Sequence, residues 1–346
     1  MKAELLKLEE LGETEDYESK LEQAGAHFVQ SRIFELWQKS AGHRVRTFVI
    51  YQQNEAVLFF RLIVYPLWRK KTYLYLPHGP VLFKPIDKPI TDFLFQSLSR
   101  LAKAERAVFV RFDPWPKDFW PTSSNQKFYQ PPYLAYHFAS GQPKYEWLVD
   151  LTEDENLLWQ KLNRKQRYLI RWAEKQGVTI DIVDQGMDRY ADDFFKLMKI
   201  TATRNKFCPH PKEYYQQALA IAEKRGNSFL AIARYNNQIM AMGFIVCFAG
   251  VANYVFAASG NNQKNLRFAD LIQWHSFKAS KQRGCHHYSF GGINGPKVYK
   301  PSWQGLTSFK QKFPGQMVEF ADFYDVVNMP FWYCLYLIRK FLTQKS

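Results

Sequence analysis

The sequence predicts a mixed α/β (α+β) fold arranged as two tandem domains, and three observations support this prediction. The chain has 346 residues, which at a usual domain size of about 150 residues corresponds to two domains. Hydrophobic residues make up 47% of the chain, so it has the apolar side chains that a disordered chain lacks. Similar runs of predicted strands and helices also recur in the two halves, which indicates a degenerate internal duplication.

The first half begins with helices and continues with strands. Helical spacing of apolar residues predicts helices at residues 17–24 and 32–40. The elements that follow are, in order, a hairpin of strands 46–51 and 55–65 around the polar turn 52–54, a strand at 72–76, a helix at 90–106 and a buried strand at 107–112. Residues 114–143 are rich in Pro, Ser, Asn and Gln and form the predicted connection between the domains.

The second half repeats this order. It opens with a strand at 146–151, after which Thr152 is expected to cap a basic helix at 156–176, with Glu155 completing the capping box. The remaining predicted elements are a strand at 178–183, helices at 187–204 and 211–224, a hairpin of strands 229–234 and 239–248, a strand at 252–257, a helix at 269–282 and a strand at 287–290. Both halves therefore place a helix and a strand after a meander of strands.

This order of elements is that of the acyltransferase fold of the GNAT type. We therefore expect two tandem GNAT-like domains, one formed by residues 1–145 and completed by 318–346, the other formed by residues 146–317. The acetyl-CoA version of the fold binds a pyrophosphate with a Q/R-x-x-G-x-G/A turn at a helix N-terminus. The chain has no such turn, which lowers the expectation of an acetyl-CoA enzyme.

Composition restricts the partners and the compartment. The net charge of +15 favours a polyanion or an anionic surface as partner. The first sixteen residues are charged throughout, and the longest apolar runs, 56–60 and 331–338, are too short to span a bilayer. The four cysteines lie far apart without a C-x-x-C motif, as is usual in a reducing cytosol. These features predict a cytoplasmic protein.

Metal and cofactor motifs are absent from the sequence. Cys285, His286 and His287 are adjacent, but neighbouring residues of a strand point to opposite faces, so ordinary packing explains this cluster better than a metal site. The chain also lacks the P-loop, the dinucleotide fingerprint, H-E-x-x-H and G-x-S-x-G. We expect neither a metal nor a cofactor.

A set of short segments carries a family resemblance by its order. The segments are Phe28-Val29-Gln30-Ser31, residues 75–81 (YLPHGPV), Val149-Asp150-Leu151, residues 161–178, Thr201-Ala202-Thr203-Arg204, Tyr254, Phe290-Gly291-Gly292 and residues 308–313 (SFKQKF). Over nearly the whole chain, this pattern resembles the FemABX family of peptidoglycan bridge-forming aminoacyltransferases. The resemblance implies an aminoacyl-tRNA donor and a peptidoglycan precursor as acceptor, either lipid II or UDP-MurNAc-pentapeptide. Because no long heptad insertion is present, the chain is similar to the compact members without a coiled-coil arm.

The resemblance also implies roles for single residues. Lys310 matches a lysine thought to stabilise the tetrahedral oxyanion of acyl transfer, although an ordinary solvated lysine is the alternative. Arg204 matches an arginine that holds the acceptor diphosphate, with a helix-end arginine bound to local carbonyls as the alternative. In the first domain, the matching lysine position is Gln38, and Lys39 follows it.

Three tyrosines are further candidates for substrate binding. Tyr215 and Tyr254 match aromatic positions that line the acceptor channel in the family. Tyr75 opens the Pro- and Gly-containing segment beside the expected pocket, a segment whose part is mainly architectural. In a chain with 20 tyrosines, packing in the core is an equal alternative for each of the two channel positions.

Two further segments are candidates for binding anionic partners. The cations of the basic helix could neutralise phosphates of a tRNA, or they could form an ordinary solvated helix face; they are Lys161, Arg164, Lys165, Arg167 and Arg171. Residues 329–342 are aromatic and then basic, ending in Arg339-Lys340, a composition typical of a helix at an anionic lipid surface. The alternative is a helix that completes the core of the first domain.

The expected function is therefore transfer of Gly, Ala or Ser from aminoacyl-tRNA to the stem-peptide amine of the precursor, which forms an interpeptide bridge. Neither a covalent enzyme intermediate nor a side-chain base is predicted. We expect a monomer in the cytoplasm with peripheral contact at the inner membrane surface. The alternatives are a GNAT-type N-acyltransferase with another acyl donor and a non-catalytic RNA- or membrane-binding protein.

Overall fold

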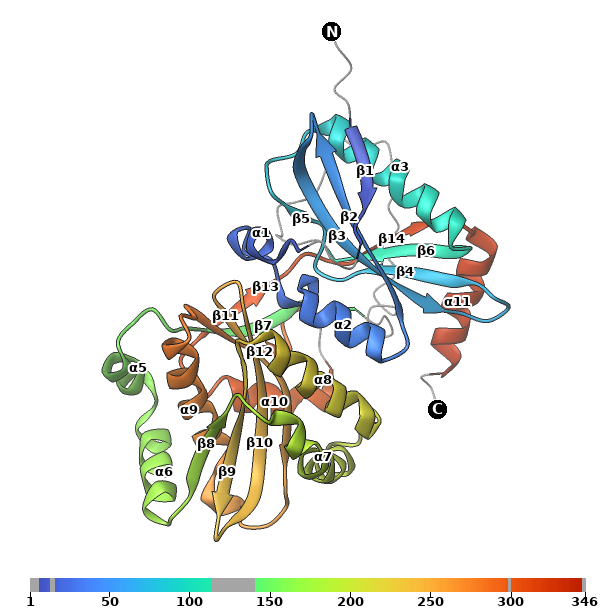
Figure 1. Ribbon diagram of the computed structural model, residues 1–346. Helices are drawn as coiled ribbons and strands as arrows, with labels where there is room; N and C mark the ends of the chain where they lie inside the picture. The colour runs from blue at the N-terminus through green and yellow to red at the C-terminus, as the bar shows by residue number, and fades with distance from the viewer. Residues whose placement is uncertain (1–5, 13–15, 114–140, 298–299, 344–346) are drawn as a thin grey trace. The chain divides into compact units, whose positions relative to one another are not determined.

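A computed structural model describes residues 6–12, 16–113, 141–297 and 300–343. Most of the predicted connection, residues 114–140, lies outside the described residues. The chain divides into two compact units (Figure 1): unit 1 comprises Met1–Lys144 with Glu319–Ser346, and unit 2 comprises Tyr145–Val318. Each unit contains a sheet covered by helices, so the predicted mixed α/β class is confirmed.

Unit 1 is built on a sheet with the strand order β1-β2-β3-β4-β6-β14, in which β5 also pairs with β3. The strands are β1 (Leu6–Glu10), β2 (Arg44–Gln52), β3 (Glu55–Pro66), β4 (Thr72–Leu76), β5 (Val81–Leu82), β6 (Ala107–Phe112) and β14 (Tyr324–Val327). Neighbouring strands run antiparallel except β4 and β6, which pair in parallel. The predicted hairpin is confirmed: Gln53 and Asn54 both have positive φ, as a type I′ turn requires.

Helices cover both faces of the unit 1 sheet. The helices are α1 (Glu18–Gln23), α2 (Arg32–Ser40), α3 (Lys88–Ala104) and α11 (Pro330–Thr343). The apolar residues of α3, among them Leu94 and Leu98, pack with Val110 in one core cluster. On the other face, Tyr333 and Tyr336 of α11 pack with Phe109. The C-terminal helix therefore contributes to the core of unit 1.

A buried ion pair holds the C-terminal segment in unit 1. The Arg111 guanidinium on β6 donates two hydrogen bonds of 2.8 Å to the Asp325 carboxylate on β14, and the two residues are 1% and 0% exposed. Burial alone would lower the pKa of Arg111, but the Asp325 carboxylate raises it above its ordinary value. The Tyr333 hydroxyl donates a further hydrogen bond of 2.6 Å to Asp325. One carboxylate thus joins β6, β14 and α11.

Unit 2 repeats the arrangement around a sheet of order β13-β7-β12-β11-β10-β9-β8. The strands are β7 (Tyr145–Asp150), β8 (Thr179–Val183), β9 (Ser228–Tyr235), β10 (Gln238–Phe248), β11 (Val251–Ser259), β12 (His287–Gly292) and β13 (Gln316–Glu319). As with β4 and β6 in unit 1, β11 and β12 pair in parallel, and the helix α9 lies between them in the sequence. Asn236 and Asn237 have positive φ at the β9–β10 turn, so this predicted hairpin is also confirmed.

The helices of unit 2 are α5 (Glu155–Lys161), α6 (Arg164–Lys175), α7 (Ala191–Asn205), α8 (Lys212–Arg225), α9 (Phe268–Gln282) and α10 (Gln304–Lys310). Residues of α6 and α9, among them Ile170, Leu271 and Phe277, pack in one core cluster with the sheet. Residues of α7 and α8 pack on Phe256 of β11 and its surroundings. Figure 1 shows α6 and α9 on one side of this sheet and α7 and α8 on the other.

The single basic helix predicted at residues 156–176 is wrong. The chain leaves the helical conformation at Leu162, and the Asn163 side chain accepts a hydrogen bond from the Gln166 N–H, which starts α6 as a new helix. The predicted cap of the first helix is also wrong. Asp154 caps α5 through the Leu157 N–H, whereas the Thr152 hydroxyl donates to Asp150.

The longest helix among the described residues is α3, with 17 residues. The part of the chain that the structure describes therefore contains no long coiled-coil arm, as predicted. Within the same residues, no helix combines the length and the apolar character needed to cross a bilayer.

We predict that Arg111→Met lowers the free energy of unfolding of unit 1 by about 3–5 kcal/mol, because it leaves the Asp325 carboxylate buried without its cation. Urea denaturation monitored by tryptophan fluorescence measures this loss. The double variant Arg111→Met/Asp325→Leu should recover part of it, because neither charge then remains buried.

The matched control is Lys88→Gln, which breaks an exposed ion pair with Asp92 on α3 of the same unit. It should cost less than about 1 kcal/mol. An equal loss for Arg111→Met and Lys88→Gln would contradict the prediction.

Candidate functional site

Lys310 is a buried cation at the C-terminus of α10. Its side chain is 5% exposed, and its ammonium donates a hydrogen bond of 2.7 Å to the Gly292 carbonyl at the end of β12. Burial lowers the pKa of Lys310 to about 8, while the charge of Glu146 on β7 opposes this shift. An ammonium has three donors, and Gly292 accepts from one of them. Lys310 is therefore a desolvated donor that is mostly protonated at neutral pH and loses its proton at about pH 8.

Glu146 is the charged neighbour of Lys310, and Ser289 binds Glu146. Glu146 is 5% exposed and accepts a hydrogen bond of 2.6 Å from the Ser289 hydroxyl on β12. Burial raises the pKa of Glu146, and the Ser289 hydrogen bond and the Lys310 charge partly offset that rise. Sequence analysis did not identify either residue, because Glu146 reads as one position of an ordinary strand.

The segment that precedes Lys310 is held in place by Asn294. The Asn294 side chain bonds the Lys300 N–H (2.8 Å) and the Lys300 carbonyl (3.0 Å), and the Asn294 N–H donates to the Thr307 hydroxyl (2.9 Å). These bonds connect the chain after β12 to α10. They restrict the position from which Lys310 reaches Gly292.

Arg204 lies in the last turn of α7 and binds the end of β11. Its guanidinium donates to the carbonyls of Ser259 and Gly260, to the Ser259 hydroxyl and to the Asn261 side chain, at 2.8–3.3 Å. The residue is nevertheless exposed. Arg204 therefore makes the local carbonyl contacts that were the alternative to diphosphate binding. These contacts orient a guanidinium that still faces solvent.

Tyr215 and Tyr254 lie on opposite faces of the unit 2 sheet. The Tyr215 ring on α8 packs 5.3 Å from the Phe256 ring, and its hydroxyl accepts from the His210 N–H. Tyr254 instead packs on the α9 side, where a Cβ at Gly243 would meet its ring at 2.7 Å. A register shift in the β10–β11 ladder separates Tyr254 from Phe256, because a bulge reverses the alternation of side chains. The structure therefore does not bring these two tyrosines together.

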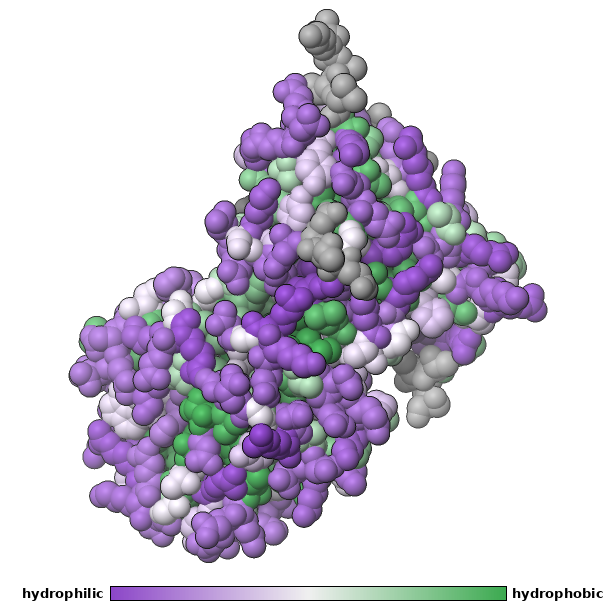
Figure 2. Space-filling model, viewed as in Figure 1, coloured by the Kyte–Doolittle hydropathy of each residue, from purple (hydrophilic) through white to green (hydrophobic). Residues whose placement is uncertain are grey.

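The basic segment forms an exposed surface on α5 and α6. Lys161, Arg164, Lys165 and Arg171 are exposed, and Arg167 is half-buried. Arg167 donates to the carbonyls of Gln160 and Leu162, the Arg171 guanidinium lies 5.1 Å from the Trp159 ring centroid, and Lys161 forms an ion pair with Glu153 at 2.6 Å. Figure 2 shows mostly hydrophilic side chains over these helices.

Unit 1 contains a second buried polar cluster, centred on Asp113 at the end of β6. The Tyr75 hydroxyl donates to the Asp113 carboxylate (3.1 Å), which also accepts from the backbone N–H groups of His78 (2.9 Å) and Gln142 (3.1 Å). Burial raises the pKa of Asp113 to about 7 despite these hydrogen bonds. A carboxyl group with this pKa can accept or donate a proton near neutral pH.

Asp113 is a functional candidate that sequence analysis missed. In the sequence, Asp113-Pro114 ends a strand, and only the fold shows that Asp113 is 4% exposed and lies beside Tyr75. One feature of the sequence could have identified Asp113. It follows a strand whose side chains are apolar except for Arg111, and polar groups at strand ends often line functional sites.

Lys39 belongs to a different group of charges in unit 1. Its ammonium lies 3.0 Å from the Glu35 carboxylate one helical turn earlier, and Glu35 also contacts Arg61 and Arg32. Glu35 is 3% exposed, whereas the Lys39 side chain is 31% exposed. Lys39 is therefore a partly exposed cation held by a buried carboxylate.

Family models match both halves of the chain. Residues 10–127 match the model of the FemAB family, and residues 160–301 match the acetyltransferase (GNAT) domain. Together the two matches cover most of unit 1 before the connection and most of unit 2.

Characterised relatives match along most of the chain. The lipid II:glycine glycyltransferase of Staphylococcus haemolyticus is 19% identical over 330 residues, covering 75% of this chain and 78% of that protein. The protein of the same name from Staphylococcus aureus (strain USA300) is 20% identical over 332 residues, with the same coverage.

Solved structures agree in fold. The crystal structure of FemX superposes with a TM-score of 0.77 at 16% identity, covering 94% of this chain and 99% of that one. A tandem GNAT protein from the clavulanic acid biosynthesis pathway superposes with a TM-score of 0.57 at 11% identity, covering 94% and 99%. The predicted fold of two tandem GNAT-like domains is thus confirmed. Together, the FemAB match over residues 10–127 and the similarity to the glycyltransferases along most of the chain support membership of the FemABX family, and the FemX structure agrees in fold.

Proposed function

We propose that this protein transfers an amino acid from aminoacyl-tRNA to the stem-peptide amine of a peptidoglycan precursor and so forms an interpeptide bridge. The observation that carries the proposal is Lys310, a buried ammonium with a lowered pKa in a chain of the FemABX family. The relatives are lipid II:glycine glycyltransferases, so glycine and lipid II are the first donor and acceptor to test. Alanine, serine and UDP-MurNAc-pentapeptide are the further choices.

The reaction exchanges an ester for an amide. The neutral acceptor amine attacks the ester carbonyl of the aminoacyl-tRNA and forms a C–N bond, and a tetrahedral intermediate with an oxyanion results. The C–O bond to the ribose then breaks, the amine loses a proton, and the ribose hydroxyl gains one. Because the donor ester is already activated, positioning and stabilisation of the oxyanion suffice, and neither a cofactor nor a covalent enzyme intermediate is needed.

Lys310 is the proposed oxyanion donor. The Gly292 carbonyl fixes its ammonium with one hydrogen bond, which leaves two further N–H groups by valence. Burial strengthens the interaction of these groups with a developing negative charge, because the local dielectric constant is low. The negative charge of Glu146 raises the pKa of Lys310 and so offsets part of the fall that burial causes. Most Lys310 side chains are therefore protonated at neutral pH.

The exposed cations of α5 and α6 are the proposed binding surface for tRNA. Lys161, Arg164 and Lys165 face solvent around the N-terminus of α6, where cations and the helix dipole both attract phosphate. Arg171 is exposed further along the same helix. Arg204 is the proposed ligand for the acceptor diphosphate, and Lys39, Tyr75, Tyr215 and Tyr254 are the other proposed substrate contacts. We place the protein in the cytoplasm as a monomer, where charged tRNA is available.

A second candidate is an N-acyltransferase that uses another acyl donor, since residues 160–301 match the acetyltransferase (GNAT) domain. Saturable binding of acetyl-CoA in calorimetry, together with no transfer from any aminoacyl-tRNA, would favour this candidate. Transfer of radiolabelled glycine from glycyl-tRNA to lipid II in a reconstituted assay would support the first.

We predict that Lys310→Met lowers kcat by about 10²–10³-fold, the usual effect of removing one oxyanion donor. Single-turnover transfer of radiolabelled glycine at saturating acceptor measures the loss. The matched control is Lys312→Met, which removes an exposed lysine two residues away and should leave kcat within about twofold. If both variants keep wild-type turnover, Lys310 is not the oxyanion donor.

The pH dependence of the reaction follows from the same ammonium. Because burial lowers the pKa of Lys310 to about 8, the protonated form predominates below that pH and is lost above it. The reaction also needs a neutral acceptor amine, whose fraction rises about tenfold per pH unit up to a pKa of about 10. We predict that kcat rises up to about pH 8 and then levels off, because loss of the Lys310 ammonium offsets the gain in neutral amine, as measured in stopped-time assays with intact aminoacyl-tRNA. Lys310→Arg keeps its charge at these pH values, so its kcat should continue to rise above pH 8, even if its absolute rate is lower. A wild-type rate that continues to rise through pH 9 would contradict this role.

We predict that Arg164→Gln/Lys165→Gln weakens tRNA binding and lowers the slope of log K against log salt concentration by about 2, one for each lost phosphate contact. Fluorescence anisotropy with labelled tRNA at several salt concentrations measures the slope. The matched control is Lys224→Gln/Arg225→Gln, which removes an exposed adjacent pair at the end of α8. Equal slopes for both double variants would mean that net charge, and not α6, binds the tRNA.

A further inference from the structure

The outer face of α11 carries an exposed apolar stripe. Phe331, Leu335, Ile338 and Leu342 recur at the spacing of one helix face. Phe331, Ile338 and Leu342 are 69%, 55% and 62% exposed. Four of the nine large hydrophobic side chains that are exposed within the described residues belong to this helix, so the exposed apolar area is concentrated here. A concentrated patch of this kind marks an interaction surface.

Cations border the stripe and extend onto the β3–β4 connection. Arg69 and Lys70 are exposed at a turn in which both have positive φ. This turn is joined to α11 by its neighbours: the Trp68 and Trp332 rings are 6.4 Å apart, and Lys71 lies 5.5 Å from the Trp332 ring centroid. With Arg339 and Lys340, residues 66–72 and 330–343 contain five basic residues and no acidic residue.

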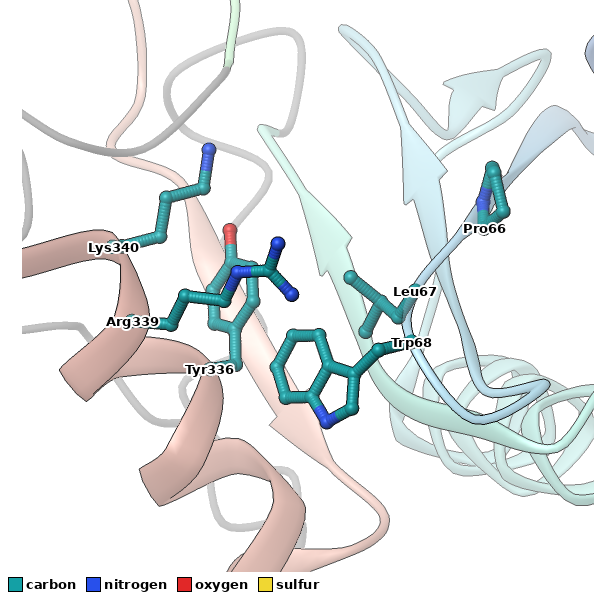
Figure 3. A pocket seen from close by; sticks show the side chains of 6 residues that line it. All are labelled: Pro66, Leu67, Trp68, Tyr336, Arg339 and Lys340. Carbon is teal, nitrogen blue, oxygen red and sulfur yellow. The ribbon is translucent and has the colours of Figure 1, made fainter. Parts of the chain in front are cut away.

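A pocket of about 450 Å³ lies between these two segments (Figure 3). Its lining residues are Pro66, Leu67, Trp68, Tyr336, Arg339 and Lys340. The Arg339 guanidinium lies 5.2 Å from the Trp68 ring centroid, and the Lys340 ammonium lies 6.0 Å from the Tyr336 ring centroid. Guanidinium and ammonium groups above aromatic walls can donate charge-assisted hydrogen bonds to a phosphate group.

We propose that α11 and the β3–β4 connection dock unit 1 on an anionic phospholipid bilayer. The apolar stripe then lies at the boundary between headgroups and acyl chains, and a lipid phosphate occupies the pocket at Arg339 and Lys340. Charge complementarity favours this occupant. An apolar stripe bordered by cations is typical of a helix that lies on an anionic membrane. With 14 residues, α11 is about 21 Å long, so it lies on the bilayer and does not span it.

The proposal goes beyond the proposed function, because docking requires neither tRNA nor a peptidoglycan precursor. Cosedimentation of the full-length protein with vesicles tests it directly. We expect binding to vesicles of phosphatidylglycerol and phosphatidylcholine in equal parts and little binding to phosphatidylcholine alone.

Matched variants locate the surface. Arg339→Gln/Lys340→Gln should weaken binding to the anionic vesicles by about 30-fold, as expected for two cations near the membrane. Arg100→Gln/Lys103→Gln removes two exposed cations from α3 of the same unit and should change binding less than about threefold. Ile338→Ser/Leu342→Ser removes exposed apolar groups without changing charge and should also weaken binding. Equal effects of the two charge variants would overturn the proposal.

Two exposed cysteines allow a positional test. Cys334 lies on the exposed side of α11 and Cys208 lies in unit 2, whereas Cys247 and Cys285 are buried. An environment-sensitive fluorophore on Cys334 in the Cys208→Ser protein should shift its emission to the blue with anionic vesicles. The same fluorophore on Cys208 in the Cys334→Ser protein should not.

Two results of the labelling experiment would overturn the proposal. One is an equal shift at Cys334 and Cys208, which would indicate non-specific adsorption to the vesicles. The other is a shift at Cys334 that grows with protein concentration without vesicles, which would indicate that a second copy of this chain covers the stripe. Because no assay of transfer is involved, these failures are distinguishable from failure of the proposed function.

Discussion

The ion pair between Arg111 and Asp325 is the interaction on which the C-terminal part of unit 1 depends. The chain leaves unit 1 after β6, forms unit 2, and returns as β14, which pairs with β6. At that pairing the Asp325 carboxylate accepts two hydrogen bonds from the Arg111 guanidinium and one from the hydroxyl of Tyr333 on α11. A charge buried in this way is stable only with its partner in place. Asp325 therefore helps to fix α11, and with it the pocket beside Trp68, together with the packing of Tyr333 and Tyr336 on Phe109.

Much of the fold could be predicted from local patterns, and the parts that could not depend on distant partners. The turn residues Asn54 and Asn237 indicate their hairpins because asparagine tolerates positive φ, and the helix–strand order after each meander reveals the duplication. In contrast, no local sequence pattern indicates that β14 pairs with β6 or that β7 pairs with β12. The division of the basic segment into α5 and α6 was missed because it depends on one capping side chain, Asn163, inside a continuous helical periodicity.

The candidate site was predictable only in part, for the same reason. Lys310 was identified by resemblance, but its environment comes from two distant strands. Gly292 on β12 accepts its hydrogen bond, and Glu146 on β7, which binds Ser289 of β12, is its buried charged neighbour. The separation of Tyr254 from Tyr215 depends on a one-residue shift in the β10–β11 ladder. In a regular strand, Tyr254 and Phe256 would share a face, and both tyrosines would then have lined one wall. Sequence spacing alone assumes regular alternation, which a bulge interrupts.

The cations behind the net charge of +15 lie in different environments. Arg61 and Arg111 are buried opposite Glu35 and Asp325. Because a guanidinium keeps its proton, loss of either partner would leave a charge buried alone and destabilise the fold. Lys310 is also buried near a carboxylate, but there burial outweighs the charge of Glu146 and the pKa falls to about 8. A cation in that state can respond to a charge that appears only during a reaction, which an arginine in a closed ion pair cannot do. The exposed cations of α6 and α11 are hydrated, and salt screens their electrostatic attraction to distant charges. They are therefore suited to binding polyanions and anionic membrane surfaces. The location of each cation, and not the total charge, therefore determines which chemistry it can support.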